Sequence, residues 1–386
     1  MEKRFVYADN AATTQPRKEA IEEMMPYLTE GWGNPSSIHS KGEEAKAALA
    51  SYRERAAQVL GCDASEIVFT SCGTEADNHA IRGAAYANAG KGKHIITTKV
   101  EHPAVLNTCR ALEKEGFRVT YLDVDGEGRV SPEKVYAAIC EDTVLVSVMY
   151  ANNEIGTVMP VREIAEVCKK RGVLFMTDAV QAVGAYPLNV RELGVDLLTA
   201  SGHKIGAPKG IGLLYIKKGT KIKNLIEGGG QEKARRGGTE NLPYIAAFAK
   251  ALELAYAETA DNARIIKMRD RLIEGLLQIP RSRLNGSRTE RLPGNVNISF
   301  ECIEGESILL LMDMAGICCS TGSACSSNSL DPSHVLLAIG LPHEVAHGSV
   351  RITLSHGNTE EDVDYIIEKL TAIVARLRAM SPLWNE

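Results

Sequence analysis

Between residues 66 and 216, short apolar runs alternate with longer amphipathic stretches. Strands that are covered on both faces have this near-continuous apolar character. The runs predict strands over residues 67–70, 94–98, 117–122, 144–149, 173–177, 196–199 and 211–216. Strands that alternate with helices form a mostly parallel sheet through right-handed crossovers. Because no helix-length segment separates the last two strands, we expect part of this sheet to be mixed.

The pattern changes after about residue 240. Long helical stretches over 242–256, 262–279 and 359–380 surround a few strands, including 295–300 and 349–353. This order predicts a smaller α+β domain after the large one, and 386 residues are enough for both. The predicted fold class is therefore α/β, with a large, mostly parallel sheet domain and a smaller α+β domain.

Composition narrows the functional classes. Hydrophobic residues make up 44% of the chain, charged residues 24%, and the formal net charge is −5. These values are typical of a globular protein and give no sign of binding to nucleic acid or to an anionic membrane. No apolar run reaches the roughly 18 residues of a membrane span, and the N-terminus is too polar for a signal peptide. The nine cysteines lack a regular spacing, so we expect a cytoplasmic protein with reduced thiols.

The segment 70–79 follows a strand, turns through small residues and opens a helix. Free N–H groups and the positive end of the helix dipole at such a turn can bind a phosphate, with Ser71 and Thr74 as hydroxyl donors. For this segment alone, an ordinary strand–helix turn capped by Thr74 is the more common interpretation.

Two charged residues lie near the ends of later strands. Lys204 follows the strand 196–199, at a position where ligands bind in α/β sheets and where a lysine can form a Schiff base. Asp178 closes the strand 173–177 and can hold the protonated ring nitrogen of a pyridine cofactor. Taken singly, a surface lysine and an N-cap aspartate are the alternatives. Together with the phosphate turn, the two residues match what pyridoxal phosphate requires, and His102 is a candidate to stack on the ring and relay protons.

Cys325 lies in a ten-residue loop of small and polar residues, 320–329. Reactive thiols are accessible, whereas structural thiols are buried. The loop therefore predicts an accessible nucleophile on a long tether. The alternative is a chance surface cysteine, which is uncommon.

His343-Glu-Val-Ala-His347 matches the HExxH pattern of zinc proteases. Pro342 before it and Gly348 after it limit the helix to little more than one turn. Two histidines need a firm helix to bind one metal ion, so we predict no metal site here.

Further motifs accompany these residues along almost the whole chain. They are Tyr7-Ala-Asp-Asn-Ala-Ala-Thr-Thr14, Gly33-Asn-Pro-Ser-Ser37, Phe69-Thr-Ser-Cys-Gly-Thr-Glu75, Glu101-His-Pro103, Asn152-Asn-Glu-Ile-Gly156, Asp178-Ala-Val-Gln181, Ser201-Gly-His-Lys204, Arg236-Gly-Gly-Thr239, Glu304-Gly-Glu306 and Gly322-Ser-Ala-Cys325. With them the chain resembles the cysteine desulfurases of the NifS/IscS type. These are pyridoxal-phosphate enzymes of the type I (aspartate-aminotransferase-like) fold.

The resemblance implies a catalytic role for Cys325, Lys204 and His102. It also implies a cofactor site, with Lys204 as the Schiff-base lysine, Asp178 at the ring nitrogen and a phosphate site completed by the second subunit of a homodimer. The cofactor-binding residues are Gly73, Thr74, His102, Asn153, Asp178, Gln181, Ser201, His203, Lys204 and, from the partner, Thr239. The implied substrate-binding residues are Asn34, Asn153 and Arg351, of which the arginine would clamp the substrate carboxylate.

The implied reaction converts L-cysteine to L-alanine and leaves a persulfide on Cys325. That sulfur would pass to an acceptor such as an iron–sulfur scaffold protein. Selenocysteine lyase and aminotransferase are the alternatives on the same fold. The large domain would span residues 14–256, and residues 1–13 with 257–386 would form the small domain. Two departures from the family pattern, Gly73 and Gly238, are expected to loosen a phosphate-binding turn.

Overall fold

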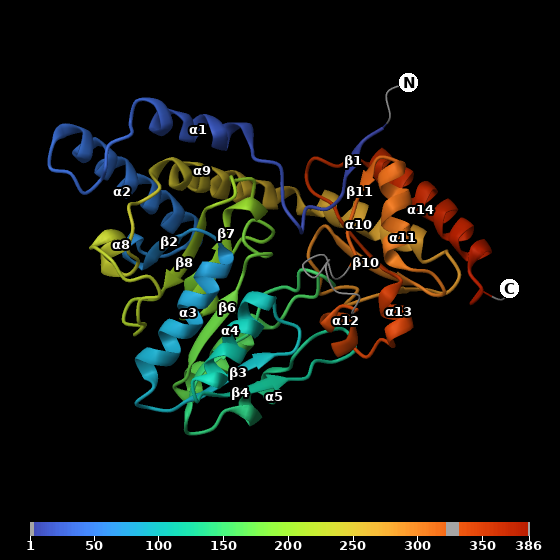
Figure 1. The fold of residues 1–386 in the computed structure, drawn as a ribbon, viewed down its shortest axis with the longest axis horizontal. Helices are drawn as coiled ribbons and strands as arrows, with labels where there is room; N and C mark the ends of the chain where they lie inside the picture. Colours follow the sequence, from blue (N-terminus) through green and yellow to red (C-terminus); the bar gives the residue numbers. More distant parts are fainter. Residues whose placement is uncertain (1–3, 322–331, 385–386) are drawn as a thin grey trace.

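The computed structural model describes residues 4–321 and 332–384. Its centre is a seven-stranded sheet in the order β2-β8-β7-β6-β5-β3-β4 (Figure 1). The strands are β2 (Ile67–Thr70), β3 (His94–Thr98), β4 (Arg118–Leu122), β5 (Thr143–Ser147), β6 (Leu174–Asp178), β7 (Leu197–Ser201) and β8 (Gly212–Ile216). All seven predicted strands are present, within a few residues of their predicted bounds.

Pairing within this sheet is parallel except at β8, which runs antiparallel to both β2 and β7. The prediction of a mixed region is therefore confirmed, and its cause is the short connection between β7 and β8. Because β8 is antiparallel to both of its neighbours, β2 runs in the same direction as β7 and therefore as β3, β5 and β6. The carboxyl ends of these strands consequently meet at one edge of the sheet.

Helices cover both faces of the sheet (Figure 1). Leu213 and Tyr215 of β8 point into one buried cluster with α2, α6 and α9, whereas Leu214 and Ile216 point into the other with α3 and α4. This period of two explains why each strand is apolar throughout. The elements outside the sheet in this half are α1 (Lys18–Thr29), α2 (Ser40–Leu60), η1 (Ala64–Glu66), α3 (Gly73–Asn88), α4 (Pro103–Lys114), α5 (Pro132–Ala138), α6 (Val161–Arg171), α7 (Val190–Leu193), η2 (Gly202–Lys204), α8 (Gln231–Ala234), α9 (Leu242–Glu258) and η3 (Thr259–Asp261).

A second core lies around an antiparallel sheet of the order β12-β10-β9. Its elements are α10 (Asn262–Leu276), β9 (Ser282–Leu284), β10 (Asn295–Phe300), α11 (Gly305–Met314), β11 (Ile317–Cys318), β12 (Ser349–Thr353) and α14 (Glu360–Met380). The N-terminal strand β1 (Val6–Tyr7) pairs in parallel with β11, and Val6 is buried in this second core. The first residues of the chain thus pack with the last third of it (Figure 1).

Two short helices, α12 (His334–Ala338) and α13 (His343–His347), come after residues 322–331 in the sequence. Helix α13 contains the HExxH pattern and has five residues, with Pro342 at its N-cap and Gly348 at its C-cap. The predicted length limit is confirmed. Leu336 and Ala346 pack in the core of the large sheet. Within the described ranges, no helix is long and apolar enough to cross a bilayer.

A buried ion pair fixes the glycine-rich segment 228–238 to the large sheet. Arg53 of α2 donates from Nη1 and Nη2 to the two carboxylate oxygens of Glu232, each at 2.7 Å. Glu232 also accepts from the backbone N–H of Phe69 at 2.9 Å, and both charged side chains are almost fully buried. A bidentate pair with this additional donor has the geometry that a buried charge requires.

We predict that Glu232→Ala lowers the thermal midpoint of unfolding by several degrees. The substitution leaves the Arg53 guanidinium buried without its partner, which costs about 3–5 kcal/mol. Differential scanning calorimetry at a fixed scan rate measures the shift. Glu360→Ala, which removes an exposed pair with Lys267, is the control and is expected to change the midpoint little. Equal midpoints for both variants would contradict the importance of the buried pair.

Candidate active site

Four predicted site segments meet at the carboxyl edge of the large sheet. Asp178 is the last residue of β6, and Ser201 is the last residue of β7. Lys204 ends the single turn η2 that follows β7. His102 lies four residues beyond β3, and α3 begins at Gly73, three residues beyond β2. The topology therefore brings together residues that are separated by more than 100 positions in the sequence.

Asp178, His102 and Lys204 lie close enough to affect one another electrostatically. Burial raises the pKa of Asp178, while His102, the backbone N–H of Val180 and Lys204 oppose this rise. Burial also lowers the pKa of His102. The charge of Asp178 opposes this lowering, and the charge of Lys204 adds to it. Asp178 accepts a hydrogen bond from the N–H of Val180 at 2.9 Å. A turn follows it, so the N-cap alternative for this aspartate is wrong.

His102 is held by its position at the start of a helix. It is the N-cap of α4, and its Nδ1 accepts from the N–H of Ala104 at 3.1 Å. Pro103 occupies the first helical position, where a missing N–H costs nothing. This capping bond fixes the ring plane and leaves Nε2 directed away from the helix end.

Lys204 lies under the N-terminal segment of the chain. Its Nζ donates to the carbonyl oxygens of Ala11 and Ala12, the second at 2.8 Å. Gln181 donates to the same Ala11 carbonyl at 3.0 Å. Both side chains border a cavity of about 460 Å³, and the Lys204 side chain is half-buried. Asp178, His102 and Arg351 do not line this cavity, so it is not the space that these residues surround.

His203 faces the same N-terminal segment. Its Nδ1 lies 3.2 Å from Oγ1 of Thr13, and its carbonyl accepts from both the N–H and the hydroxyl of Thr14. Burial lowers the pKa of His203 to about 4, with help from the charge of Lys204. The imidazole is therefore neutral at physiological pH.

The start of α3 packs tightly against the other strand ends. A Cβ on Gly73 would lie 2.9 Å from Cγ2 of Val180 and 3.3 Å from Cβ of Ser201. Glycine thus lets the helix N-terminus approach the residues that follow β6 and β7. This helix has 16 residues, and its first N–H groups lie next to Ser201, where groups of this kind can bind an anion.

The side chains around this turn differ from the prediction in two respects. The N-cap is Cys72, whose Sγ accepts from the N–H of Glu75, so capping by Thr74 is wrong. The hydroxyl of Ser71 is bonded to Glu75. Thr74 itself is exposed.

Arg236 brings the glycine-rich segment to the same helix start. Its guanidinium donates to Glu75, with Nε 2.9 Å from Oε1. Burial alone would raise the pKa of Glu75, but the hydrogen bonds from Arg236 and Ser71 lower it overall. Thr239 follows this segment and is exposed, and Asn34 is exposed on a turn before α2. These two predicted site residues are not part of the buried group around Asp178.

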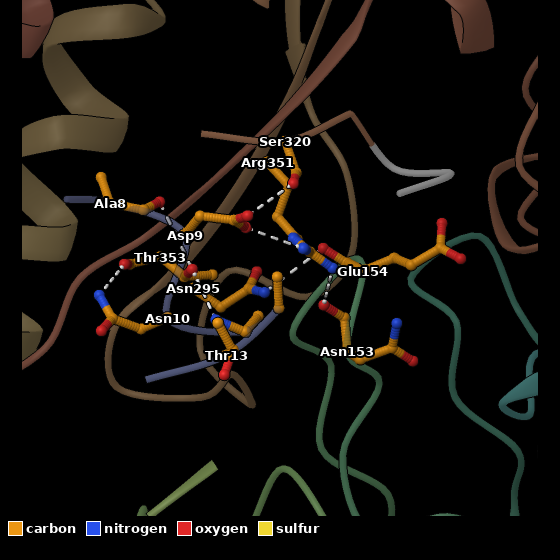
Figure 2. A network of polar contacts seen from close by, with 12 residues as sticks. Ala8, Asp9, Asn10, Thr13, Asn153, Glu154, Asn295, Ser320, Arg351 and Thr353 are labelled. Carbon is orange, nitrogen blue, oxygen red and sulfur yellow. Dashed lines mark hydrogen bonds and ion pairs between the residues drawn. The ribbon is translucent and has the colours of Figure 1, made fainter. Parts of the chain in front are cut away.

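Arg351 joins three segments in a polar network (Figure 2). It lies on β12 and is 2% exposed. Its Nη2 is 3.0 Å from Oδ1 of Asp9, and its Nη1 donates to the carbonyl of Asn153 at 3.2 Å. The other Asp9 oxygen accepts from the hydroxyl of Ser320 at 2.9 Å. Nε of Arg351 is buried and has no hydrogen-bond partner within the described chain.

Cys325, the predicted nucleophile, lies outside the described residues. The network nevertheless reaches the start of its loop, because Ser320 exchanges backbone hydrogen bonds with Arg351. The described chain therefore places the anchor of that loop beside Arg351.

Two buried carboxylates beneath the site were not predicted. Asp77 of α3 accepts from the hydroxyl of Thr199 at 2.7 Å, and Thr199 pairs with Asp178 in the sheet register. Glu101 accepts at Oε1 from the hydroxyl of Thr98 at 2.7 Å and from the N–H of Met149 at 3.0 Å. Burial raises the pKa of both carboxyls, and the charge of Asp178 raises them further. Asp77 interrupts the apolar face of α3, which was the available sequence signal.

We predict that Glu101→Gln removes a pH dependence of stability. The pKa of Glu101 is raised from 4.5 to about 8 in the fold. The folded chain therefore binds one more proton than the unfolded chain between these pH values, so stability falls as pH rises through this window. Glutamine stays neutral throughout. Thermal midpoints measured across the window should decline less steeply for the variant than for the wild type. Parallel pH profiles would show that Glu101 is ionised in the folded chain.

Comparison with known proteins agrees with this geometry. The aminotransferase class-V family model matches residues 6–366. Cysteine desulfurase IscS of Methanosarcina thermophila is 56% identical over 383 residues, which cover 99% of this chain and 95% of that protein.

Solved structures are similar over nearly the same length. A NifS-like protein superposes with a TM-score of 0.91 at 40% identity and covers 97% of this chain and 100% of its own. SspA, solved in complex with cysteine, has a TM-score of 0.81 at 36% identity, over 90% of this chain and 98% of its own. The chain therefore belongs to the class-V aminotransferase family and, within it, to the cysteine desulfurases of the NifS/IscS type.

Proposed function

We propose that this chain uses pyridoxal phosphate to convert L-cysteine to L-alanine and retains the sulfur as a persulfide on Cys325. The observation that carries this proposal is the meeting of Lys204, Asp178 and His102 at one sheet edge. An amine, a carboxylate and an imidazole in mutual range are the groups that the ring of this cofactor uses.

The described residues fit the cofactor in two further ways. The N-terminus of α3 packs so closely on Val180 and Ser201 that a side chain at position 73 would fill the space between them. The neutral imidazole of His203 lies beside Lys204. In the proposal, the backbone at Gly73 and Thr74 holds the phosphate together with Ser201, His203 and Thr239 of the partner subunit. Asp178 pairs with the ring nitrogen, and Gln181 and Asn153 contact the ring hydroxyl or the substrate.

When bound, the cofactor supplies an electron sink that weakens the carbon–sulfur bond of cysteine. Lys204 Nζ is then the base that moves the substrate proton, and His102 stacks on the ring face. Arg351 holds the substrate carboxylate through a guanidinium that is already fixed by Asp9 and by the carbonyl of Asn153. Asn34 lies in the substrate region in this proposal.

In the proposed sulfur transfer, one bond forms as another breaks. The Cys325 thiolate forms a bond to the substrate sulfur as the carbon–sulfur bond breaks, and the carbon takes up a proton to give alanine. The sulfur is left on Cys325 as a persulfide. A long loop suits this task because its thiol must reach the substrate and later an acceptor.

We further propose that the chain acts as a homodimer in the cytoplasm and donates sulfur to an iron–sulfur scaffold protein. The eight described cysteines are all free, as in a reducing compartment.

We also propose a division of the chain into two domains, one of residues 14–256 and the other of residues 1–13 together with 257–386. Val6 and Ala8 support it, because both are buried with α10 and α14.

Product analysis separates the alternatives. Turnover of selenocysteine without turnover of cysteine would indicate a selenocysteine lyase, and a keto-acid product would indicate an aminotransferase.

We predict that Arg351→Lys raises the KM for cysteine with a smaller effect on kcat. Lysine keeps the charge but loses the bidentate geometry, and a hydrogen bond to a charged group is worth about 1.5–3 kcal/mol, or roughly 10- to 100-fold in KM. Steady-state kinetics measures the change. Arg283→Lys on the exposed strand β9 is the matched control and should leave KM unaltered. An unchanged KM in Arg351→Lys would remove this residue from the substrate site.

We predict that Cys325→Ala prevents the mass gain of one sulfur atom that follows incubation with L-cysteine. The cofactor absorbance should still change when cysteine is added, since Lys204 and Asp178 are intact. Peptide mass spectrometry locates the added sulfur, and Cys318→Ser is the control that should gain it normally. Release of sulfur to a thiol acceptor at the wild-type rate by Cys325→Ala would contradict the assignment.

A further inference from the structure

A second group of chemically reactive side chains lies at the opposite edge of the large sheet. His94 is the first residue of β3, and Cys140 and Asp142 immediately precede β5. The sulfur of Cys140 is 3.1 Å from Nδ1 of His94 and 3.1 Å from Oδ1 of Asp142. All three potential ligand atoms lie within 4.8 Å of one another. Because β3 is parallel to β6, this amino-terminal edge is separated from the Lys204 site by the length of the strands.

His94 is oriented by two threonines. Its Nε2 lies 2.8 Å from Oγ1 of Thr120, and its Nδ1 lies 2.8 Å from Oγ1 of Thr143. With the proton on Nε2, that nitrogen donates to Thr120, and Nδ1 accepts from the Thr143 hydroxyl and lies 3.1 Å from Cys140 Sγ, so a metal ion on Nδ1 has to displace the Thr143 hydrogen bond. A histidine that binds a metal through one nitrogen and donates from the other has this arrangement.

Hydrogen bonds hold the turn that carries Cys140 and Asp142. The N–H of His94 donates to the carbonyl of Asp142 at 3.0 Å, and the N–H of Cys140 donates to Oγ1 of Thr143 at 2.9 Å. The turn 140–143 is therefore tied to the start of β3. The sheet therefore holds the backbone of all three residues close together.

Arg118 already places a positive charge on this group. Its Nη2 donates to Cys140 Sγ at 3.2 Å and to Asp142 Oδ1 at 2.9 Å. The Arg118 side chain is 55% exposed, whereas His94 is buried. The arginine therefore has room to move into solvent while the buried His94 keeps its position.

We propose that His94, Cys140 and Asp142 bind a thiophilic divalent cation of the zinc class, which takes the place of Arg118. Zinc bonds of 2.0–2.3 Å in a tetrahedron need ligand atoms about 3.5 Å apart, so the two contacts of Cys140 Sγ must open by about 0.4 Å. The separation of His94 from Asp142, which is within 4.8 Å, must adjust to the same value. One thiolate, one imidazole and one carboxylate favour zinc over magnesium or calcium. Water would fill the fourth position.

The test measures zinc binding to the full chain carrying Cys325→Ala, so that the catalytic-loop thiol takes up no metal. Equilibrium dialysis with elemental analysis gives the stoichiometry, and X-ray absorption at the zinc edge identifies the ligands. We expect one zinc per chain with one sulfur and otherwise nitrogen or oxygen ligands. Cys140→Ser should abolish binding, and Asp142→Asn should weaken it. Both residues are partly exposed, so neither change should prevent folding.

Two further variants make the result specific. Arg118→Ala removes the cation that competes for the same ligand atoms and should tighten binding by roughly tenfold or more. Cys62→Ser is the matched control, because Cys62 is also half-buried with carboxylates nearby, and it should bind zinc unchanged. Zinc retained by Cys140→Ser, or no zinc bound even by Arg118→Ala, would overturn the proposal. Alanine formation by the chain with Cys325 intact tests the proposed function separately.

Discussion

The common direction of β2, β3, β6 and β7 is the constraint on which the rest of the molecule depends. It brings the residues that follow four separate strands to one edge, where Asp178, His102, Lys204 and the start of α3 meet. The buried charge of Asp178 is tolerated there because a cation, an imidazole and a backbone N–H surround it. Asp77 and Glu101 increase the negative charge that would arise if all three carboxyls ionised. The charge of Asp178 raises the pKa of both Asp77 and Glu101, so protons on these two carboxyls relieve the repulsion.

Much of the fold could be predicted because buried parallel strands have a strong sequence pattern. The seven strands and the three long helices of the second half followed directly from apolar runs and periodicity. The helices α1 and α2 were not predicted. The first contains Pro26. The second buries small residues and the charged Arg53 beside its few large apolar side chains, which gives little contrast between its two faces. The antiparallel pairing of β2 with β8 is a contact between distant segments, and local patterns do not determine it.

In the candidate site, too, some residues could be predicted and others could not. Lys204 and Asp178 could be predicted because each lies at or just beyond the carboxyl end of a strand, where α/β sheets bind ligands. The ion pair of Arg351 with Asp9 joins residues 342 positions apart, and no spacing in the sequence indicates it. Ser71 was predicted to hold a phosphate, but its hydroxyl is bonded to Glu75. A hydroxyl in a turn has several possible acceptors, and only the packing of Arg236 and Glu75 determines which one it meets.

Residues 6–12 contact both the second core and the candidate site. Val6 and Tyr7 pair with β11, whereas the carbonyl oxygens of Ala11 and Ala12 accept the amine of Lys204. A stretch of only a few residues thus links the second core to the reactive nitrogen. Any rotation of the second core relative to the large sheet must displace this short stretch. The position of the second core thereby affects the hydrogen bonds that hold the amine of Lys204.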